Sequence, residues 1–152
     1  MLKSSTRNSM PGKIRSQRFN GFLKSVDTFR VYKGKRLVFA SRKDKLVPMV
    51  DYIDNCKPYA EGVVVYDRIV GNAAALLLKT ISCRAVYSEL GSENAIRTLD
   101  EAGIKHRFNE TVDRIMNDSG QDMCPMERLS LGKTPDQFYR ALKERMGGGG
   151  KK

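Results

Sequence analysis

Twice along the chain, a strand-like run passes directly into a helix-like run, and this repeat limits the fold more than any other feature. Residues 62–66 form a continuous β-branched run, which is typical of a strand buried in a parallel sheet. The run continues through Asp67 and Gly71 into an Ala- and Leu-rich helix predicted over residues 72–81. Such a strand-to-helix unit indicates an α/β fold.

The second unit begins with a strand predicted at residues 84–88 and continues into a helix with clear signals at both ends. Gly91 interrupts the strand pattern, and the Ser92 hydroxyl can accept hydrogen bonds from the first free amides of a helix. Gly103 suits the left-handed conformation that ends many helices. Strands that alternate with helices in this way indicate a mostly parallel sheet covered on both faces.

Weaker patterns extend the sheet on either side of these two units. Two short alternating runs flank a turn at residues 33–35, which is the pattern of a β-hairpin. Further elements are expected at 28–32 and 36–40 (hairpin strands), 45–56 (helix), 106–108 (fifth strand), 111–116 (short helical turn) and 134–146 (a helix begun by Thr134 and Pro135). The sequence therefore predicts a three-layer α/β/α sandwich around a mixed, mostly parallel five-stranded sheet.

The net charge of +11 is concentrated at one end of the chain. Residues 1–45 hold 13 basic and two acidic residues, whereas residues 46–152 hold 15 of each. A basic segment over residues 1–24 can contact nucleic acid through phosphates, or it can be a solubilising extension. Both interpretations remain open.

The chain of 152 residues has the size of one domain. We expect a basic flexible arm at 1–22, an α/β domain at 23–146 and a flexible Gly/Lys tail at 147–152. The longest apolar run, residues 73–78, is far shorter than the roughly 20 residues of a membrane-spanning helix. We therefore expect no membrane partner.

Three cysteines, Cys56, Cys83 and Cys124, are odd in number and widely spaced, which favours reduced thiols in a cytoplasmic protein. Cys124 is a candidate nucleophile or redox thiol, assisted by Asp67 or Glu127 as the other catalytic residues. The alternative for Cys124 is a thiol packed as a small apolar side chain. The alternative for Asp67 is a turn-forming aspartate that accepts nearby backbone N–H groups.

Ligands in open α/β sheets bind beyond the carboxyl ends of the strands, where helix N-termini present free N–H groups. Two junctions of this chain, residues 67–72 and 88–92, fit that description. We expect them to form a shared, metal-free hollow that holds a nucleotide or a related phosphorylated small molecule. The expected ligand-binding residues are Gly71, Asn72, Ser88, Glu89, Gly91 and Ser92.

Residues 66–77, together with residues 124–127 (Cys-Pro-Met-Glu), make a family recognisable. They resemble an uncharacterised prokaryotic family, domain of unknown function eighteen-ninety-three, over about residues 25–142. The resemblance implies a cytidine deaminase-like fold that lacks the zinc site of those enzymes. It implies a fold and no activity.

The residues themselves argue against deaminase-type zinc chemistry. A zinc deaminase needs a His or Cys ligand at one helix start, a glutamate two residues on, and a Cys-x-x-Cys pair at the next helix start. This chain offers Asn72 at the first start and Gly91 and Asn94 at the second, and its only histidine is His106 on the fifth strand. We therefore expect no metal ligand, no cofactor and no zinc-dependent deamination.

Three hypotheses for function follow from the sequence. The first is a zinc-independent binding domain for a nucleotide or phosphorylated metabolite. The second is a metal-independent enzyme that uses Cys124. The third is a nucleic-acid adaptor that binds through the basic residues 1–24.

Overall fold

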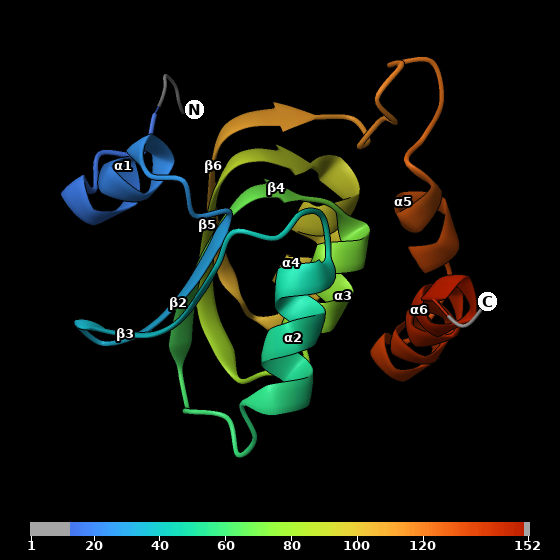
Figure 1. Cartoon of the computed structure of the whole chain (residues 1–152). Helices are drawn as coiled ribbons and strands as arrows, with labels where there is room; N and C mark the ends of the chain where they lie inside the picture. Colours follow the sequence, from blue (N-terminus) through green and yellow to red (C-terminus); the bar gives the residue numbers. More distant parts are fainter. Residues whose placement is uncertain (1–12, 151–152) are drawn as a thin grey trace.

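The computed structural model describes residues 13–150, which form one five-stranded sheet with helices on both faces (Figure 1). The strands lie in the order β3-β2-β4-β5-β6. Their bounds are β2 (Phe29–Lys33), β3 (Arg36–Ser41), β4 (Val63–Val70), β5 (Cys83–Ser92) and β6 (Lys105–Val112). The helices are α1 (Gln17–Lys24), α2 (Val47–Asn55), α3 (Asn72–Leu78), α4 (Glu93–Ala102), α5 (Pro125–Ser130) and α6 (Pro135–Gly150).

The strand directions make the sheet evenly mixed. Strand β2 is antiparallel to both β3 and β4, whereas β4, β5 and β6 are parallel to one another. The α/β class and the five strands are confirmed, but the expectation of a mostly parallel sheet is wrong. Strand β2 pairs with β3 along one edge and with β4 along the other. The β2–β4 pair is also antiparallel, and local sequence patterns do not specify it.

One face of the sheet holds the larger core, made by α2, α3, α4 and α6. Val63 and Val65 of β4 point into it, together with Leu77 of α3 and Phe138 of α6. All seven residues of α3 are buried. A helix that is apolar all round is expected to lie inside a domain, and α3 contacts α4, α5 and α6 as well as β4.

The other face is covered by α1, a helix that the sequence analysis did not predict. Ser16 caps its start, where the Ser16 Oγ accepts a hydrogen bond from the Phe19 amide. Phe19 and Phe22 lie one turn apart and are fully buried against Tyr66. The expectation of a flexible arm is therefore wrong for residues 13–22, and residues 1–12 lie outside the described part of the chain.

Arg68 of β4 ties the end of α1 to the sheet. Its guanidinium donates hydrogen bonds of 2.8–3.1 Å to four backbone carbonyls. Those carbonyls belong to Phe22, Leu23, Ser25 and Asp27. A cation at this position satisfies carbonyl groups that a helix C-terminus leaves free and complements the negative end of the helix dipole.

Several boundaries differ from the expected ones. Strands β4 and β5 continue to Val70 and Ser92, so Asp67 lies within a strand. The helical turn expected at 111–116 is wrong, because β6 continues through Val112. Helix α6 continues into the glycines to Gly150, where a loose tail was expected, and residues 151–152 lie outside the described range.

Other local signals are confirmed. Gly103 ends α4 in the left-handed region with φ 71°. Thr134 and Gln137 exchange side-chain-to-amide hydrogen bonds of 3.2 and 3.0 Å at the start of α6, which is a capping box. Between residues 13 and 150, no helix is both long and apolar enough to cross a membrane.

Candidate functional site

Helices α3 and α4 begin side by side at the carboxyl ends of β4 and β5. Val70 pairs with Gly91 in the parallel ladder, so the two helix starts lie on neighbouring strands. Ser92 caps α4, and its Oγ accepts a hydrogen bond of 3.1 Å from the Ala95 amide. The structure thus brings together the two junctions that the sequence analysis singled out.

A carboxylate of the chain itself occupies the space between these helix starts. Glu127 Oε2 accepts a hydrogen bond of 2.6 Å from the Asn72 amide, and Oε1 accepts one of 3.1 Å from the Ala73 amide. The Ser92 hydroxyl donates to Glu127 Oε2 at 3.4 Å. The Glu127 side chain is 2% exposed. Because negative charge is stabilised at a helix N-terminus, Glu127 takes the place of an external anion on α3.

The two glycines of the predicted site make room for side chains of this chain. A Cβ atom on Gly71 would lie 2.5 Å from Glu127 Oε1. A Cβ atom on Gly91 would lie 2.0 Å from the Phe108 ring. Both glycines therefore permit the close approach of α5 and β6 to the helix starts.

The Asn72 side chain joins three helices. Its Nδ2 donates a hydrogen bond of 3.0 Å to Ser130 Oγ of α5, and its Oδ1 accepts one from the Thr98 hydroxyl of α4. Ser130 Oγ in turn donates to the Glu127 carbonyl at 2.7 Å. This buried network fixes α5 against the starts of α3 and α4.

Asp67 lies in β4 beside Ser88 of β5, and both are buried. Asp67 Oδ1 accepts a hydrogen bond of 2.8 Å from the Arg68 amide, so it does bond to a nearby N–H group, but it lies within a strand and forms no turn. Burial raises the pKa of Asp67 to about 7, and hydrogen bonds from the Arg68 and Ile69 amides oppose that rise. The Ser88 hydroxyl donates to the Leu90 carbonyl at 2.9 Å.

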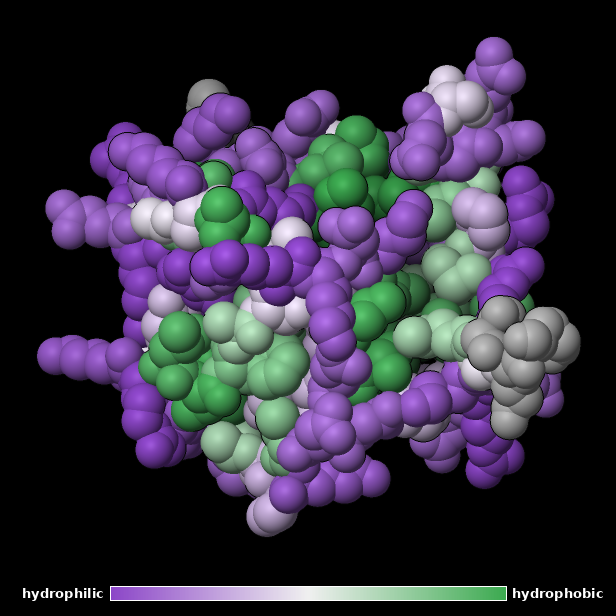
Figure 2. All heavy atoms as spheres, viewed as in Figure 1, coloured by the Kyte–Doolittle hydropathy of each residue, from purple (hydrophilic) through white to green (hydrophobic). Residues whose placement is uncertain are grey.

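The outer surface at this end of the sheet is partly apolar. Ile69, near the end of β4, is 49% exposed, and Figure 2 shows hydrophobic side chains gathered over this end of the sheet. Glu89 is exposed, and no ion pair involves it among residues 13–150. A highly charged ligand finds few partners here.

Cys124 is half-buried at the start of α5. Its amide donates to the Ile115 carbonyl at 2.9 Å, and its carbonyl accepts from the Arg128 amide at 3.0 Å. Within residues 13–150, no hydrogen bond joins its thiol to Asp67 or Glu127. Glu127 is already engaged with α3, so thiol chemistry at Cys124 stays a prediction without a positioned base.

The other two cysteines are half-buried. Burial raises the pKa of the Cys56 thiol, and it raises the pKa of Cys83 to about 12. Among residues 13–150, no group of three or more His, Cys, Asp or Glu side chains is placed to hold a metal ion. His106 Nε2 lies 2.9 Å from Asp100 Oδ1, so it pairs with α4.

A polar groove of about 390 Å³ lies directly beside Asn72. It is bounded by α3, α4 and the connection between α5 and α6. Three basic side chains, Lys79, Arg97 and Lys133, contribute to it, and none of them forms an ion pair in the part of the chain described. The remaining lining residues are Asn72, Leu76, Asn94, Thr98, Glu101, Leu131, Gly132, Thr134 and Pro135.

The sequence profile of a family described as a domain of unknown function, DUF1893, matches residues 20–146. The chain belongs to the DUF1893 family. Its structure is also similar to the crystal structure of a DUF1893 family protein, TM1506, from Thermotoga maritima, with a TM-score of 0.76 and 24% sequence identity. The match covers 93% of this chain and 99% of that one, and it shows a shared fold. No curated protein matches the chain.

Membership in DUF1893 confirms the family that residues 66–77 and 124–127 indicated. Those two motifs meet in the structure, because Glu127 of the second contacts Asn72 and Ala73 of the first. Sequence reasoning missed the basic groove, because Lys79, Arg97 and Lys133 come from three separate segments with no shared motif. Only the sheet order and the contact of α5 with α3 bring them together.

Proposed function

We propose that this DUF1893 domain binds a small phosphorylated molecule, such as a nucleotide, in the groove between α3, α4 and the α5–α6 connection. The observation that carries the proposal is the convergence of Lys79, Arg97 and Lys133 on one polar groove, where none of them forms an ion pair with a carboxylate of residues 13–150. Arginine and lysine donors are the side chains that most often bind phosphate oxygens. Of the described residues that line the groove, Glu101 alone is acidic.

The position of Glu127 favours the groove, and not the starts of α3 and α4, as the place where the ligand binds. The sequence pattern predicts a phosphate that accepts hydrogen bonds from the free amides of α3, but Glu127 already accepts those of the Asn72 and Ala73 amides. The neighbouring groove offers uncharged hydrogen-bonding side chains, Asn94 and Thr98, together with its three cations. A ligand held there would touch Asn72 without displacing the internal carboxylate.

The cytidine deaminase-like plan is part of the same proposal. It is supported by a hairpin followed by two strand-helix units whose helices begin side by side. Zinc deaminases hold their metal between two such helix starts. In this chain the Glu127 carboxylate lies between the starts, and Asn72, Gly91 and Asn94 stand where such enzymes carry ligands. Ligand binding without zinc hydrolysis is the function that this arrangement supports best.

Calorimetric titration of the full chain with AMP, ATP and inorganic phosphate tests the proposal. We expect a saturable signal with at least one nucleotide. The double variant Arg97→Ala/Lys133→Ala should weaken that binding by about tenfold or more, as expected for the loss of two charge-assisted contacts. The matched control, Lys105→Ala/Arg107→Ala, removes two cations from β6 and should change the affinity less than twofold.

Two results would contradict the groove proposal. One is an absence of binding, and of any rise in melting temperature, with every nucleotide at millimolar concentration. The other is equal weakening by both double variants, which would mean that only net charge matters.

A further inference from the structure

The helices on the two faces of the sheet differ in net charge within the described chain. Residues 13–24, which lead into and form α1, contain four basic and no acidic residues. Helices α2, α4 and α6 cover the other face and carry seven acidic and four basic residues. The acidic residues are Asp51, Asp54, Glu93, Asp100, Glu101, Asp136 and Glu144, and the basic ones are Arg97, Arg140, Lys143 and Arg145. The segment over residues 13–24 is thus net positive, whereas α2, α4 and α6 together are net negative, and this difference favours the α1 face for a long polyanion.

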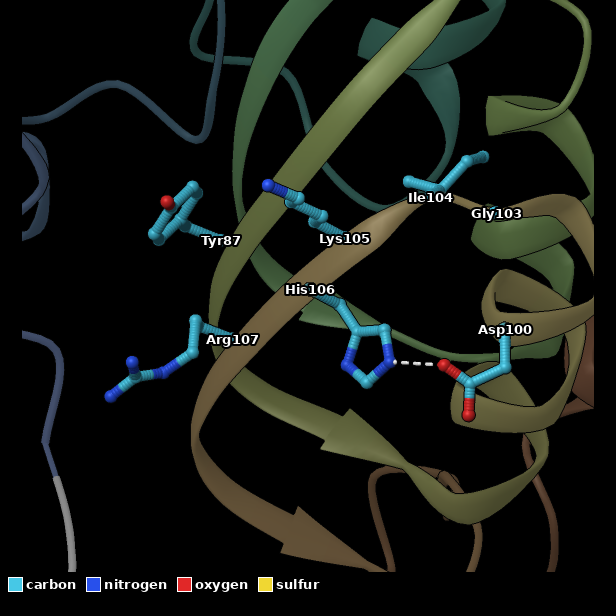
Figure 3. Close-up of a pocket in the computed structure, with 7 residues that line it drawn as sticks. All are labelled: Tyr87, Asp100, Gly103, Ile104, Lys105, His106 and Arg107. Carbon is cyan, nitrogen blue, oxygen red and sulfur yellow. Dashed lines mark hydrogen bonds and ion pairs between the residues drawn. The ribbon is translucent and has the colours of Figure 1, made fainter.

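The part of this face over β5 and β6 presents an aromatic ring between two cations. Tyr87 of β5 pairs in register with Arg107 of β6, and Ala85 pairs with Lys105. Paired residues of neighbouring strands point to the same face, and Ala85 and Tyr87 belong to the cluster under α1. Figure 3 shows Tyr87, Lys105 and Arg107 on one side of the strands and His106 on the other side, towards Asp100.

Tyr87 is the last ring of a tyrosine row that crosses the sheet. The ring centroids of Tyr32 and Tyr66 lie 5.2 Å apart, and those of Tyr66 and Tyr87 lie 5.8 Å apart. Tyr32 and Tyr66 are buried under α1, whereas Tyr87 is half-buried. Helix α1 therefore leaves Tyr87, at the outer end of the row, partly exposed to solvent.

An open hollow of about 540 Å³ lies at this edge of the sheet, lined by Tyr87, Lys105 and Arg107 and also by Asp100, Gly103, Ile104 and His106. The segment before α1 crosses β6 beside it, where the Ile14 amide donates to Asn109 Oδ1 at 2.7 Å. That hydrogen bond places the segment carrying the exposed Lys13 and Arg15 at the same edge. No ion pair involves Lys105 or Arg107 within residues 13–150.

We propose that this surface, made of Tyr87, Lys105 and Arg107, binds single-stranded nucleic acid. An unstacked base lies on the Tyr87 ring, and the flanking phosphates contact Lys105 and Arg107. Aromatic rings on a sheet surface and a row of cations are the features with which proteins hold single strands. The function is separate from small-molecule binding, because the basic groove lies on the opposite face of the sheet.

Fluorescence anisotropy with labelled 12-residue oligo(U) and oligo(dT) tests the proposal on the full chain. We expect Lys105→Ala/Arg107→Ala to weaken binding by about tenfold and to reduce the slope of log affinity against log salt by about 1.4, or 0.7 per lost phosphate contact. Tyr87→Leu should weaken binding by about fivefold or more, and Tyr87→Phe should retain it. The matched control Arg97→Ala/Lys133→Ala should bind like the unchanged protein.

Three results would overturn the proposal. One is an unchanged oligonucleotide affinity of Lys105→Ala/Arg107→Ala, which would assign any binding to residues outside this surface. Another is equal weakening by both double variants, and the third is binding to anionic lipid vesicles with no binding to either oligonucleotide. Stronger binding of oligo(U) than of oligo(dT) would identify RNA as the target, and the reverse would identify DNA.

Discussion

The two faces of the sheet bury opposite charges by different means. On the helix face, Glu127 is buried among amide and hydroxyl donors, and Asp67 is buried with only backbone donors. On the α1 face, the half-buried Arg68 donates to four carbonyls, and the Arg18 guanidinium lies 3.8 Å from the centroid of the Tyr32 ring. Among residues 13–150, no ion pair involves any of these four groups. Backbone groups and aromatic rings replace the counter-charge.

Two of these groups, Glu127 and Arg68, each close a helix end. Glu127 satisfies the first amides of α3, and Arg68 satisfies carbonyls at the end of α1. Asp67 is the exception, because it satisfies only amides of its own strand region and its pKa is raised. The three residues should therefore respond differently to substitution.

The largest effect is expected from Glu127→Ala. The change leaves the Asn72 and Ala73 amides and the Ser92 hydroxyl buried without their acceptor, which should lower the free energy of unfolding by about 4 kcal/mol. Urea unfolding followed by circular dichroism measures the loss. The exposed Glu89→Ala is the control and should change stability by less than about 0.5 kcal/mol. A loss below about 1 kcal/mol would show that Glu127 is not the acceptor on which α3 depends.

The next effect concerns Asp67 and the dependence of stability on pH. The folded pKa of about 7 lies above the unfolded value near 3.9, so the folded state holds the proton more tightly. The stability that Asp67 contributes is complete below about pH 4 and is lost as pH rises to about 7, at up to roughly 1.4 kcal/mol per pH unit. Asp67→Asn should remove this slope and stabilise the protein at pH 8. Parallel stability curves for both proteins from pH 4 to pH 8 would refute a raised pKa.

A smaller effect is expected from Arg68→Met, which keeps the length of the side chain but removes its hydrogen bonds to the end of α1. We expect the free energy of unfolding to fall by about 2 kcal/mol. Hydrogen exchange should quicken at Phe22 and its neighbours in α1 more than at Leu77 in α3. Equal quickening in both helices would mean that Arg68 supports the whole sheet and not α1 in particular.

The smallest effect is expected from Gly91→Ala, which places a methyl group against the Phe108 ring. We expect a loss of about 1–2 kcal/mol from overpacking. Adding Phe108→Leu should restore part of that loss, because it removes the ring atoms that the new Cβ meets. Differential scanning calorimetry of the single and double variants measures both steps, and an additive loss in the double variant would contradict the contact.

The sequence predicts the helix face well because its signals are local. The β-branched run of β4, the Ser92 cap and the Gly103 end signal all act within a few residues, and each is confirmed. The meeting of the two helix starts follows from the parallel order of β4 and β5. For Asp67 only the hydrogen bond from an adjacent amide is predicted correctly, and the expected turn is wrong because β4 continues to Val70.

Local sequence signals do not predict the packing of α1 on the sheet or the burial of the Glu127 carboxylate between the two helix starts. Phe19 and Phe22 are only two aromatic residues in a polar, basic segment, and their burial depends on tyrosines from β2 and β4. Glu127 lies 55 positions from Asn72, so nothing local indicates that its carboxylate reaches the start of α3. The basic groove and the Tyr87 surface likewise exist only once distant strands and helices are assembled.

Because Glu127 lies near the end of the chain, its position has a consequence for folding during translation. All five strands and the first four helices have been translated by residue 112, yet the amides at the start of α3 still lack their acceptor. A nascent chain at that stage carries a complete sheet beside an unfinished helix end. The final closure of the domain therefore waits for α5 to leave the ribosome, and a product that stops short of residue 127 lacks the group that completes it.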